Sequence, residues 1–167
     1  SLLHGISNLP TERHDLLTKI SDYIQQKVNQ QEHCNLTFIC THNSRRSHLS
    51  QIWSQVAADY YNIPDIYTYS GGTEATSFHP NAIASLQRAG FQAKIKDDSI
   101  ENSVYQIQFE PTKTQLKAWS KVYDDEANPQ KEFAAIMTCS SADADCPIVH
   151  GAEVRVPLTY NDPKAGD

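Results

Sequence analysis

The stretch Asn35–Gln55, NLTFICTHNSRRSHLSQIWSQ, places a cysteine between two segments with different hydrophobic periodicity. Residues 36–40 form a short apolar run that ends in this cysteine, and such a run is typical of a buried strand. From residue 47 to about residue 61, apolar side chains recur at the spacing of an amphipathic helix. The sequence therefore predicts a strand, a short polar loop and a helix in direct succession.

The same alternation continues along the chain. Residues 65–72 (DIYTYSGG) predict a second strand, and Pro80 and Gly90 bracket a predicted helix at its start and its end. A third strand is predicted for residues 91–95 and a fourth for residues 134–138. Strands that alternate with helices favour a parallel sheet. We therefore expect an α/β fold in three layers, with a four-stranded parallel sheet and helices on both faces.

Other segments add to this frame. Apolar residues recur at helical spacing over about 11–30, which predicts an extra N-terminal helix. Residues 103–110 alternate as a half-buried strand does, and residues 115–123 form either its antiparallel partner or a helix. We expect a β-hairpin inserted within about 101–132. Residues 152–158 read as a last extended segment outside the main sheet.

Composition limits the partners. A chain of 167 residues is long enough for one domain with its own core, so we expect residues 1–167 to form a single domain. The formal net charge of −6 argues against a broad nucleic-acid surface. No apolar run approaches the roughly 20 residues that cross a bilayer, and the first ten residues do not resemble a signal peptide. We expect a cytoplasmic protein that binds neither nucleic acid nor membranes.

The four cysteines are Cys34, Cys40, Cys139 and Cys146. In a reducing compartment, thiols are usually free, metal-bound or catalytic. The spacings contain no CxxC pair, so the sequence does not predict a structural zinc site. We expect no metal and no cofactor, and we assign Cys34 to packing near the first strand.

The loop CTHNSRR suits an anion because it leads into the N-terminus of a helix. Backbone N–H groups of such a loop point inward and, with the helix dipole, form a nest for a tetrahedral oxyanion. Arg46 can bind two oxygens of the anion, and Cys40 lies beneath its central atom, where a thiolate attacks phosphorus or arsenic. We expect Asn43 to tie the loop together and Ser47 to donate a hydrogen bond to the sulfur. The predicted anion-binding residues are Thr41, His42, Asn43, Ser44, Arg45, Arg46 and Ser47.

A buried cysteine before an ordinary helix is the alternative to this interpretation. The loop nevertheless resembles the signature loop of the low-molecular-weight protein tyrosine phosphatases and their relatives, the thioredoxin-coupled arsenate reductases, which is close to C-x-G-N-x-C-R-S. The chain keeps Cys40, Asn43, Arg46 and Ser47. It has His42 where the family usually has glycine, and Arg45 where the family often has cysteine. Residues 70–91 resemble the second strand and following helix of this family.

The segment YNDPKAGD, residues 160–167, resembles the aspartate-proline acid loop of the same family. This resemblance implies that Asp162 is the general acid that protonates the leaving oxygen. Lys164 follows the proline, at a position where the phosphatases commonly have tyrosine. The reductases also lack this tyrosine, so the segment resembles the reductase branch. The family continues into a final helix that this sequence does not include. An isolated Asp-Pro pair would otherwise be read as a simple turn.

The segment TCSSADADCP also resembles the reductases, which carry a cysteine pair at this separation followed by proline. The resemblance implies that Cys139 attacks the Cys40 sulfur and that Cys146 then attacks Cys139, which moves the disulfide to the surface. We expect residues 140–145 to form a flexible loop that permits this approach. A thioredoxin-like protein would then reduce the disulfide. Gln51 replaces a glutamate that helps to bind potassium in the reductases, which supports the expectation of no metal.

Three functions follow from these patterns. The first is reduction of arsenate to arsenite by Cys40 with the Cys139–Cys146 pair. The second is hydrolysis of phosphotyrosine or small aryl phosphates through a phosphocysteine, with the pair as a redox switch. The third is a non-catalytic oxyanion-binding module. We assign no catalytic role to His48 and His79, which we expect at the surface.

Overall fold

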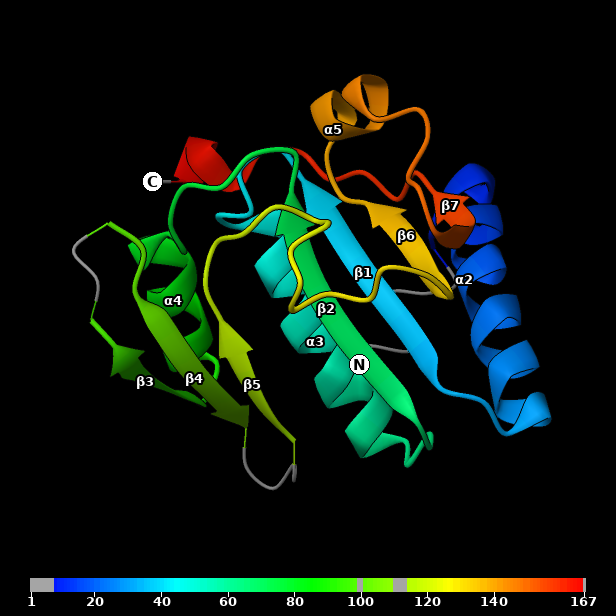
Figure 1. Ribbon diagram of the computed structural model, residues 1–167, viewed down its shortest axis with the longest axis horizontal. Helices are drawn as coiled ribbons and strands as arrows, with labels where there is room; N and C mark the ends of the chain where they lie inside the picture. The colour runs from blue at the N-terminus through cyan, green and yellow to red at the C-terminus, as the bar shows by residue number, and fades with distance from the viewer. Residues whose placement is uncertain (1–7, 99–100, 110–113, 167) are drawn as a thin grey trace.

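The computed structural model describes residues 8–98, 101–109 and 114–166. Its main sheet has four parallel strands in the order β2-β1-β6-β7 (Figure 1). The central strands are β1, Cys34–Cys40, and β6, Phe133–Met137, and the edges are β2, Ile66–Gly72, and β7, Ala152–Val156. All five β6 residues are buried, as a strand covered on both faces requires. The predicted α/β class with a parallel sheet is confirmed.

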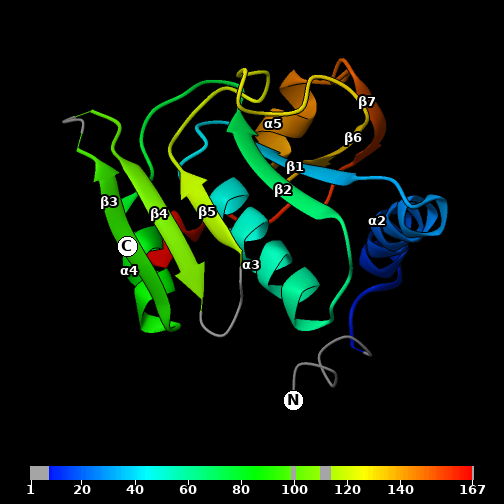
Figure 2. The same ribbon diagram turned by 60° about the horizontal axis from the view of Figure 1, so that its bottom comes forward.

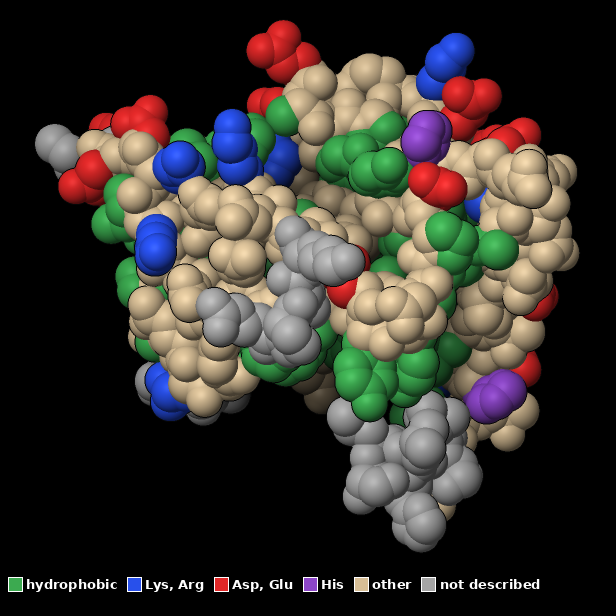
Figure 3. Space-filling model, turned by 90° about the horizontal axis from the view of Figure 1, so that it is seen from below, with side chains coloured by type: hydrophobic (Ala, Val, Ile, Leu, Met, Phe, Trp, Pro, Cys, Tyr) green, Lys and Arg blue, Asp and Glu red, His purple; other side chains and the backbone are tan. Residues whose placement is uncertain are grey.

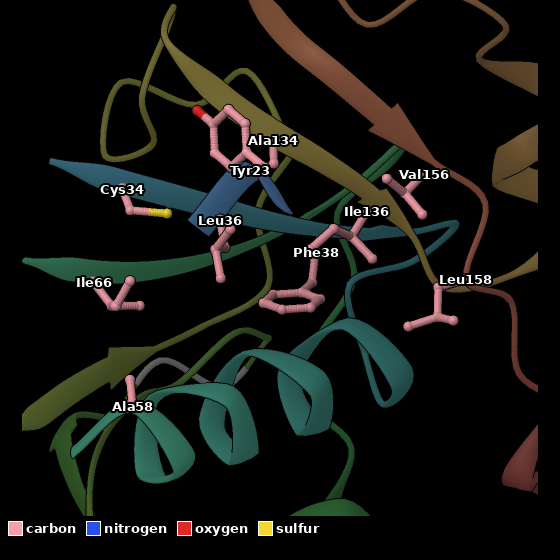
Figure 4. Packing of buried hydrophobic residues seen from close by; sticks show 10 residues of the cluster. All are labelled: Tyr23, Cys34, Leu36, Phe38, Ala58, Ile66, Ala134, Ile136, Val156 and Leu158. Carbon is pink, nitrogen blue, oxygen red and sulfur yellow. The ribbon is translucent and has the colours of Figure 1, made fainter. Parts of the chain in front are cut away.

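Two helices cover one face of this sheet. They are α2, Thr11–Gln30, and α3, Arg46–Tyr60. Figure 4 shows side chains of β1 directed from the sheet toward α3. The predicted bounds of α2 agree with its observed bounds. The buried residues of this cluster are Tyr23, Cys34, Leu36, Phe38, Ala58, Ile66, Ala134, Ile136, Val156 and Leu158.

The opposite face carries a second cluster, which includes the site cysteines. Ile39, Ala135 and Met137 come from the sheet, and Ala142 comes from the short helix α5, Ser140–Asp145. Tyr123 packs against the same cluster. The chain on this side is therefore mostly non-helical, with α5 as its helix.

A separate three-stranded antiparallel sheet lies beside the main sheet (Figure 2). Its strands are β3, Phe91–Asp97, β4, Val104–Phe109, and β5, Gln115–Ala118. Helix α4, Pro80–Arg88, and residues of α3 bury its apolar face. The β4–β5 hairpin was predicted within the insertion, and residue 110 of the predicted strand lies outside the described residues.

Two strand assignments from the sequence are wrong. Residues 91–95 were expected in the main sheet, but β3 pairs with β4 instead. Residues 152–158 were expected outside it, but β7 pairs in parallel with β6 and is the fourth main strand. The burial of β3 alternates only at its start and then gives way to exposed residues, as suits a sheet with one solvated face.

The surface of the second sheet carries exposed lysines, with the exposed Asp97 at the end of β3. In the space-filling view of Figure 3, Lys and Arg side chains gather toward this side of the molecule. Exposed Lys94 and Lys96 lie on β3, and exposed Lys117 lies on β5. The chain ends in a 3-10 helix, Pro163–Gly166. Among the described residues, none of the helices has the length and apolar character needed to cross a membrane.

Candidate active site

The loop between β1 and α3 turns its carbonyl groups outward. The Cys40 carbonyl accepts a hydrogen bond from the Thr73 N–H at 3.0 Å, and the Thr41 carbonyl accepts one from the Glu74 N–H at 2.9 Å. The Ser120 hydroxyl donates to the His42 carbonyl at 2.9 Å. In a planar trans peptide the C=O and the following N–H point in opposite directions. The N–H groups of residues 41–43 are therefore directed to the inside of the loop.

Asn43 fixes the shape of the loop. Its φ is 45°, a left-handed conformation that asparagine tolerates better than most residues. Its side chain is fully buried and donates to the Ser47 hydroxyl at 2.8 Å, while its amide oxygen accepts the Lys121 N–H at 2.9 Å. The loop is thus tied both to α3 and to the segment that follows β5.

The Cys40 sulfur lies at the base of this loop. Its Sγ atom is 3.0 Å from the Ser47 hydroxyl oxygen, and both residues are buried. The same oxygen accepts a hydrogen bond from the Asn43 side chain, and either the sulfur or the hydroxyl can be the donor in the contact between them. The Cys40 sulfur, the Ser47 hydroxyl and the Asn43 amide therefore form one buried hydrogen-bonded group beneath the loop.

Gly72, at the end of β2, makes room for the loop. A Cβ atom at this position would lie 2.5 Å from the Thr41 carbonyl oxygen, 2.8 Å from the Asn43 nitrogen and 2.3 Å from the Glu74 carbonyl oxygen. No side chain fits among these backbone atoms. The Gly71-Gly72 pair was the sequence signal for this close approach, although the sequence analysis used it only to end a strand.

Arg46 and Asp162 meet although 116 residues separate them. The Arg46 guanidinium donates to the Tyr160 carbonyl at 3.0 Å through Nη1 and to the Asp162 carboxylate at 3.2 Å through Nη2. The Asp162 side chain is half exposed. The predicted acid therefore lies beside the predicted anion-binding arginine at the start of α3.

The other charged loop residues contact the segment after β2. Arg45 Nη2 lies 2.7 Å from His79 Nε2, and His42 Nε2 lies 2.8 Å from a carboxylate oxygen of Glu74. The Ser44 carbonyl accepts the His79 N–H at 3.0 Å. These contacts fix the outer wall of the loop.

Cys139 lies next to the loop at the end of β6. Its Sγ atom is 3.4 Å from the Thr41 hydroxyl oxygen, and the side chain is almost fully buried in the same cluster as Cys40. The sulfur also accepts the Ala142 N–H at 3.4 Å, so Cys139 caps the N-terminus of α5. The parallel pairing of β1 and β6 brings Cys40 and Cys139 to the same edge of the sheet.

Cys146 lies at the other end of α5 and is half-buried. Burial raises the pKa of its thiol, the neighbouring Asp145 acts in the same direction, and Arg155 opposes them. The expected flexible loop over residues 140–145 is wrong, because these residues form α5 with the Cys139 side chain as its cap. All four cysteines are free thiols.

Two buried groups beneath the loop were missed by the sequence analysis. His48, expected at the surface, is fully buried; its ring stacks on Phe78 at 4.0 Å and its Nδ1 lies 3.2 Å from the Ser70 hydroxyl. Burial, with a smaller effect of Lys121, holds the pKa of His48 well below its usual range. Burial also lowers the pKa of Lys121 to about 8. His79 is only partly buried and caps α4 by accepting the Asn81 N–H.

Comparison with solved structures identifies the fold. The structure is similar to a low-molecular-weight phosphotyrosine phosphatase from Vibrio cholerae O395, with a TM-score of 0.50 and 16% sequence identity over 78% of this chain and 79% of that one. The fold is therefore that of the low-molecular-weight phosphatases. No family model matches the chain.

In sequence, the chain is similar to arsenate reductases. It is 27% identical to "Arsenate reductase" of Staphylococcus aureus strain Newman over 112 residues, which are 66% of this chain and 63% of that protein. It is also 27% identical to "Arsenate reductase 2" of Staphylococcus epidermidis strain ATCC 35984 over 127 residues, 75% of this chain and 76% of the relative. The chain thus spans less than two thirds of the S. aureus relative. The resemblance to the low-molecular-weight phosphatase superfamily and its arsenate reductases is confirmed.

Proposed function

We propose that the chain reduces arsenate to arsenite with its own thiols. The observation that carries this proposal is the position of Cys139, a buried free thiol whose sulfur contacts Thr41, the residue that follows the Cys40 nucleophile. Hydrolysis of a phosphoester needs no second thiol there, whereas reduction of arsenic needs a source of two electrons. The names of the staphylococcal relatives point to the same reaction.

The first step forms a bond between sulfur and arsenic. The Cys40 thiolate attacks the arsenic atom of arsenate held by the loop amides and Arg46. One As–O bond breaks, and Asp162 donates a proton to the leaving oxygen, which departs as water. Arsenic is still in the +5 state at this point. The proximity of the Asp162 carboxyl group to Arg46 supports a position for this group beside the bound anion.

The second step reduces the arsenic. The Cys139 thiolate attacks the Cys40 sulfur, a disulfide forms between them, and the bond from sulfur to arsenic breaks. The electron pair of that bond goes to arsenic, which leaves as arsenite in the +3 state. The shared burial of Cys40 and Cys139 in one cluster supports this pairing.

The third step requires α5 to open. Cys146 attacks Cys139, which frees Cys40 as a thiolate and moves the disulfide to the two ends of α5. Seven steps along the chain, at about 1.5 Å each in a helix, place the Cα atoms of these cysteines about 10 Å apart, whereas a disulfide requires Cα atoms within about 7 Å. The helix must therefore unwind before the bond forms. A dithiol protein of the thioredoxin class then reduces the disulfide.

The proposal is tested by arsenate turnover with thioredoxin, its reductase and NADPH. Cys146→Ser should complete one turnover per chain and then stop, because the first disulfide has no route to the surface. Cys139→Ala should bind arsenate and release no arsenite. Cys34→Ala is the matched control, because Cys34 is a buried free thiol in the other cluster and its loss should leave turnover intact. Sustained turnover by Cys146→Ser would refute the proposed sequence of thiols.

The second candidate is hydrolysis of phosphotyrosine or a small aryl phosphate through a phosphocysteine at Cys40. The adjacent Arg46 and Asp162 favour it, because an anion clamp beside an acid is what departure of a phenolic oxygen needs. Two results together would support this reaction over arsenate reduction. Cys139→Ala would still hydrolyse 4-nitrophenyl phosphate, and the wild type would not reduce arsenate. Cys40→Ser should abolish either activity and keep phosphate binding.

A further inference from the structure

The additional N-terminal helix contacts the segment that carries the proposed acid. Arg13, in the first turn of α2, donates through Nη1 to the Thr159 carbonyl at 2.9 Å. Its guanidinium also lies over the ring of Tyr160, 4.5 Å from the ring centre. We propose that Arg13 is a positioning residue for Asp162. This inference rests on the acid role of Asp162 in the proposed function.

The helix is a firm support for this contact. Leu16 and Leu17 of α2 pack against the cluster that contains Leu158, one residue before Thr159. Further along, the Tyr23 hydroxyl donates to Glu153 at 2.6 Å, and Lys27 forms a 3.0 Å ion pair with the same carboxylate. Glu153 belongs to β7, so the second half of α2 is fixed to the last strand of the main sheet, while its start contacts the segment after that strand.

Tyr160 receives contacts from three parts of the fold. Its N–H donates to the Thr138 carbonyl at 3.0 Å, at the end of β6. Its carbonyl accepts from Arg46, and Arg13 covers its ring. A stacked cation on a partly exposed ring contributes roughly 0.5–1 kcal/mol, and the hydrogen bond to Thr159 adds to it. Together these contacts determine where the chain lies two residues before Asp162.

The Asp162 side chain is held by fewer contacts than Tyr160. Its carboxylate accepts from Arg46 and, through the other oxygen, from the Lys164 N–H at 3.0 Å. The first partner also belongs to the proposed anion site, and the second lies in the same short segment. The place of the carboxylate relative to the anion therefore depends on residues 159 and 160, and through them on Arg13. Arg13 contacts neither the loop nor the proposed anion in this arrangement; it acts through Asp162.

The inference is tested with Arg13→Gln, Arg13→Lys and Asp162→Asn in the full chain. The rate is measured with whichever substrate, arsenate or 4-nitrophenyl phosphate, the wild type turns over. Arg13→Gln should lower kcat about 10-fold, since a misplacement near 1 Å costs up to about 100-fold. Arg13→Lys should recover part of the loss, because it keeps a cation over Tyr160. The dissociation constant for inorganic phosphate, measured by calorimetry, should stay within about twofold of wild type, since the loop is unchanged.

The decisive measurement is the double variant Arg13→Gln with Asp162→Asn. If Arg13 acts through Asp162, the double variant is no slower than Asp162→Asn alone, because the acid that Arg13 positions is already gone. Lys19→Gln, an exposed charge on the same helix, is the control and should change nothing. Losses that multiply in the double variant, or a normal kcat in Arg13→Gln, would overturn the inference and leave the acid role standing. A normal rate in Asp162→Asn would overturn the acid role and this inference with it.

Discussion

The anion loop and helix α5 adjoin one another but are held in different ways. The loop is held by hydrogen bonds from its carbonyl groups to the segments after β2 and after β5, by the two hydrogen bonds of the Asn43 side chain and by the close approach of Gly72. Helix α5 has six residues, and its C-terminal side is held by Arg155 of β7. The anion loop is therefore fixed by contacts on several sides, whereas helix α5 depends on few contacts.

This difference corresponds to two chemical demands. Attack on an oxyanion benefits from donors that are already in place, because no free energy is then spent on ordering them. Transfer of a disulfide between Cys139 and Cys146 instead requires the segment between them to unwind. Short segments with few contacts open at low free-energy cost.

Gly72→Ala should have the largest effect, because it forces the loop away from β2. The new Cβ meets backbone atoms that cannot rotate aside, and such overpacking costs about 3 kcal/mol or more. We expect phosphate affinity to fall by about 100-fold or more, as measured by calorimetry. Gly151→Ala is the matched control: its Cβ would lie 2.0 Å from the Gln130 carbonyl oxygen, away from the loop, so it should lower stability while the folded protein binds phosphate normally. Equal phosphate affinity in Gly72→Ala and wild type would show that the loop is not fixed by β2.

Lys121→Met should change how stability depends on pH. The pKa of Lys121 is lowered to about 8 by burial, whereas in the unfolded chain it returns to about 10.4. Between these values the unfolded chain binds more protons, so this group makes the free energy of unfolding rise with pH. From pH 7.5 to pH 10, wild type should gain up to about 3 kcal/mol relative to Lys121→Met in urea unfolding. A constant difference between the two proteins would mean that the ammonium is not buried beside the loop.

Arg155→Met should release α5. Arg155 donates to the Asp143 carbonyl at 2.7 Å and to the Cys146 carbonyl, and it forms an ion pair with the Asp143 carboxylate. These contacts stabilise the helix that must unwind before the Cys139–Cys146 disulfide forms. Their loss should shift the thiol–disulfide equilibrium toward the disulfide by about 10-fold, which corresponds to about 1.4 kcal/mol. Titration against a dithiol redox buffer with mass spectrometry of the trapped thiols measures this shift. An unchanged equilibrium would mean that α5 is held by something other than Arg155.

Thr41→Val should have the smallest effect. It keeps the shape of the side chain and removes the hydroxyl that contacts the Cys139 sulfur at 3.4 Å. A weak hydrogen bond to sulfur is worth about 0.5 kcal/mol, so we expect the rate of arsenite release in a single turnover to change by about two- to threefold. A change of 100-fold would give the hydroxyl a direct role in the chemistry, contrary to its proposed part as a neighbour of the thiol.

Local patterns predicted most of the elements, and non-local pairing accounts for the errors. The continuous apolar runs of β1 and β6 identified central strands, and the periodicity of residues 11–30 identified α2. The sheet that a strand joins cannot be predicted in the same way. Both β3 and β7 are short extended segments, and their local sequences do not indicate which strand each pairs with. Although Ile95 of β3 is apolar, its side chain is exposed in the second sheet.

The site shows the same division. The loop and its hydrogen bonds within residues 40–47 followed from the spacing of a few residues. The contacts of Ser120 and Lys121 with the loop, and of Arg13 with Thr159, join segments that are distant in the chain and carry no motif. The prediction of a loop for residues 140–145 was wrong because a run of small residues, four of them Ser or Asp, resembles a loop. The Cys139 sulfur, acting as a cap, stabilises these residues as a helix.

The separation of 146 positions between Arg13 and Thr159 also bears on how the protein is made. A ribosome that has released only β1 and α3 exposes a chain that already contains the loop cysteine but lacks the strand beside it, the second thiol and the acid segment. Such a nascent chain has the nucleophile without its partners, and it remains incomplete until residues 139–162 have left the exit tunnel. Assembly of the reactive centre is therefore a late event relative to synthesis of the loop, and long-range closure between α2 and the segment after β7 completes it.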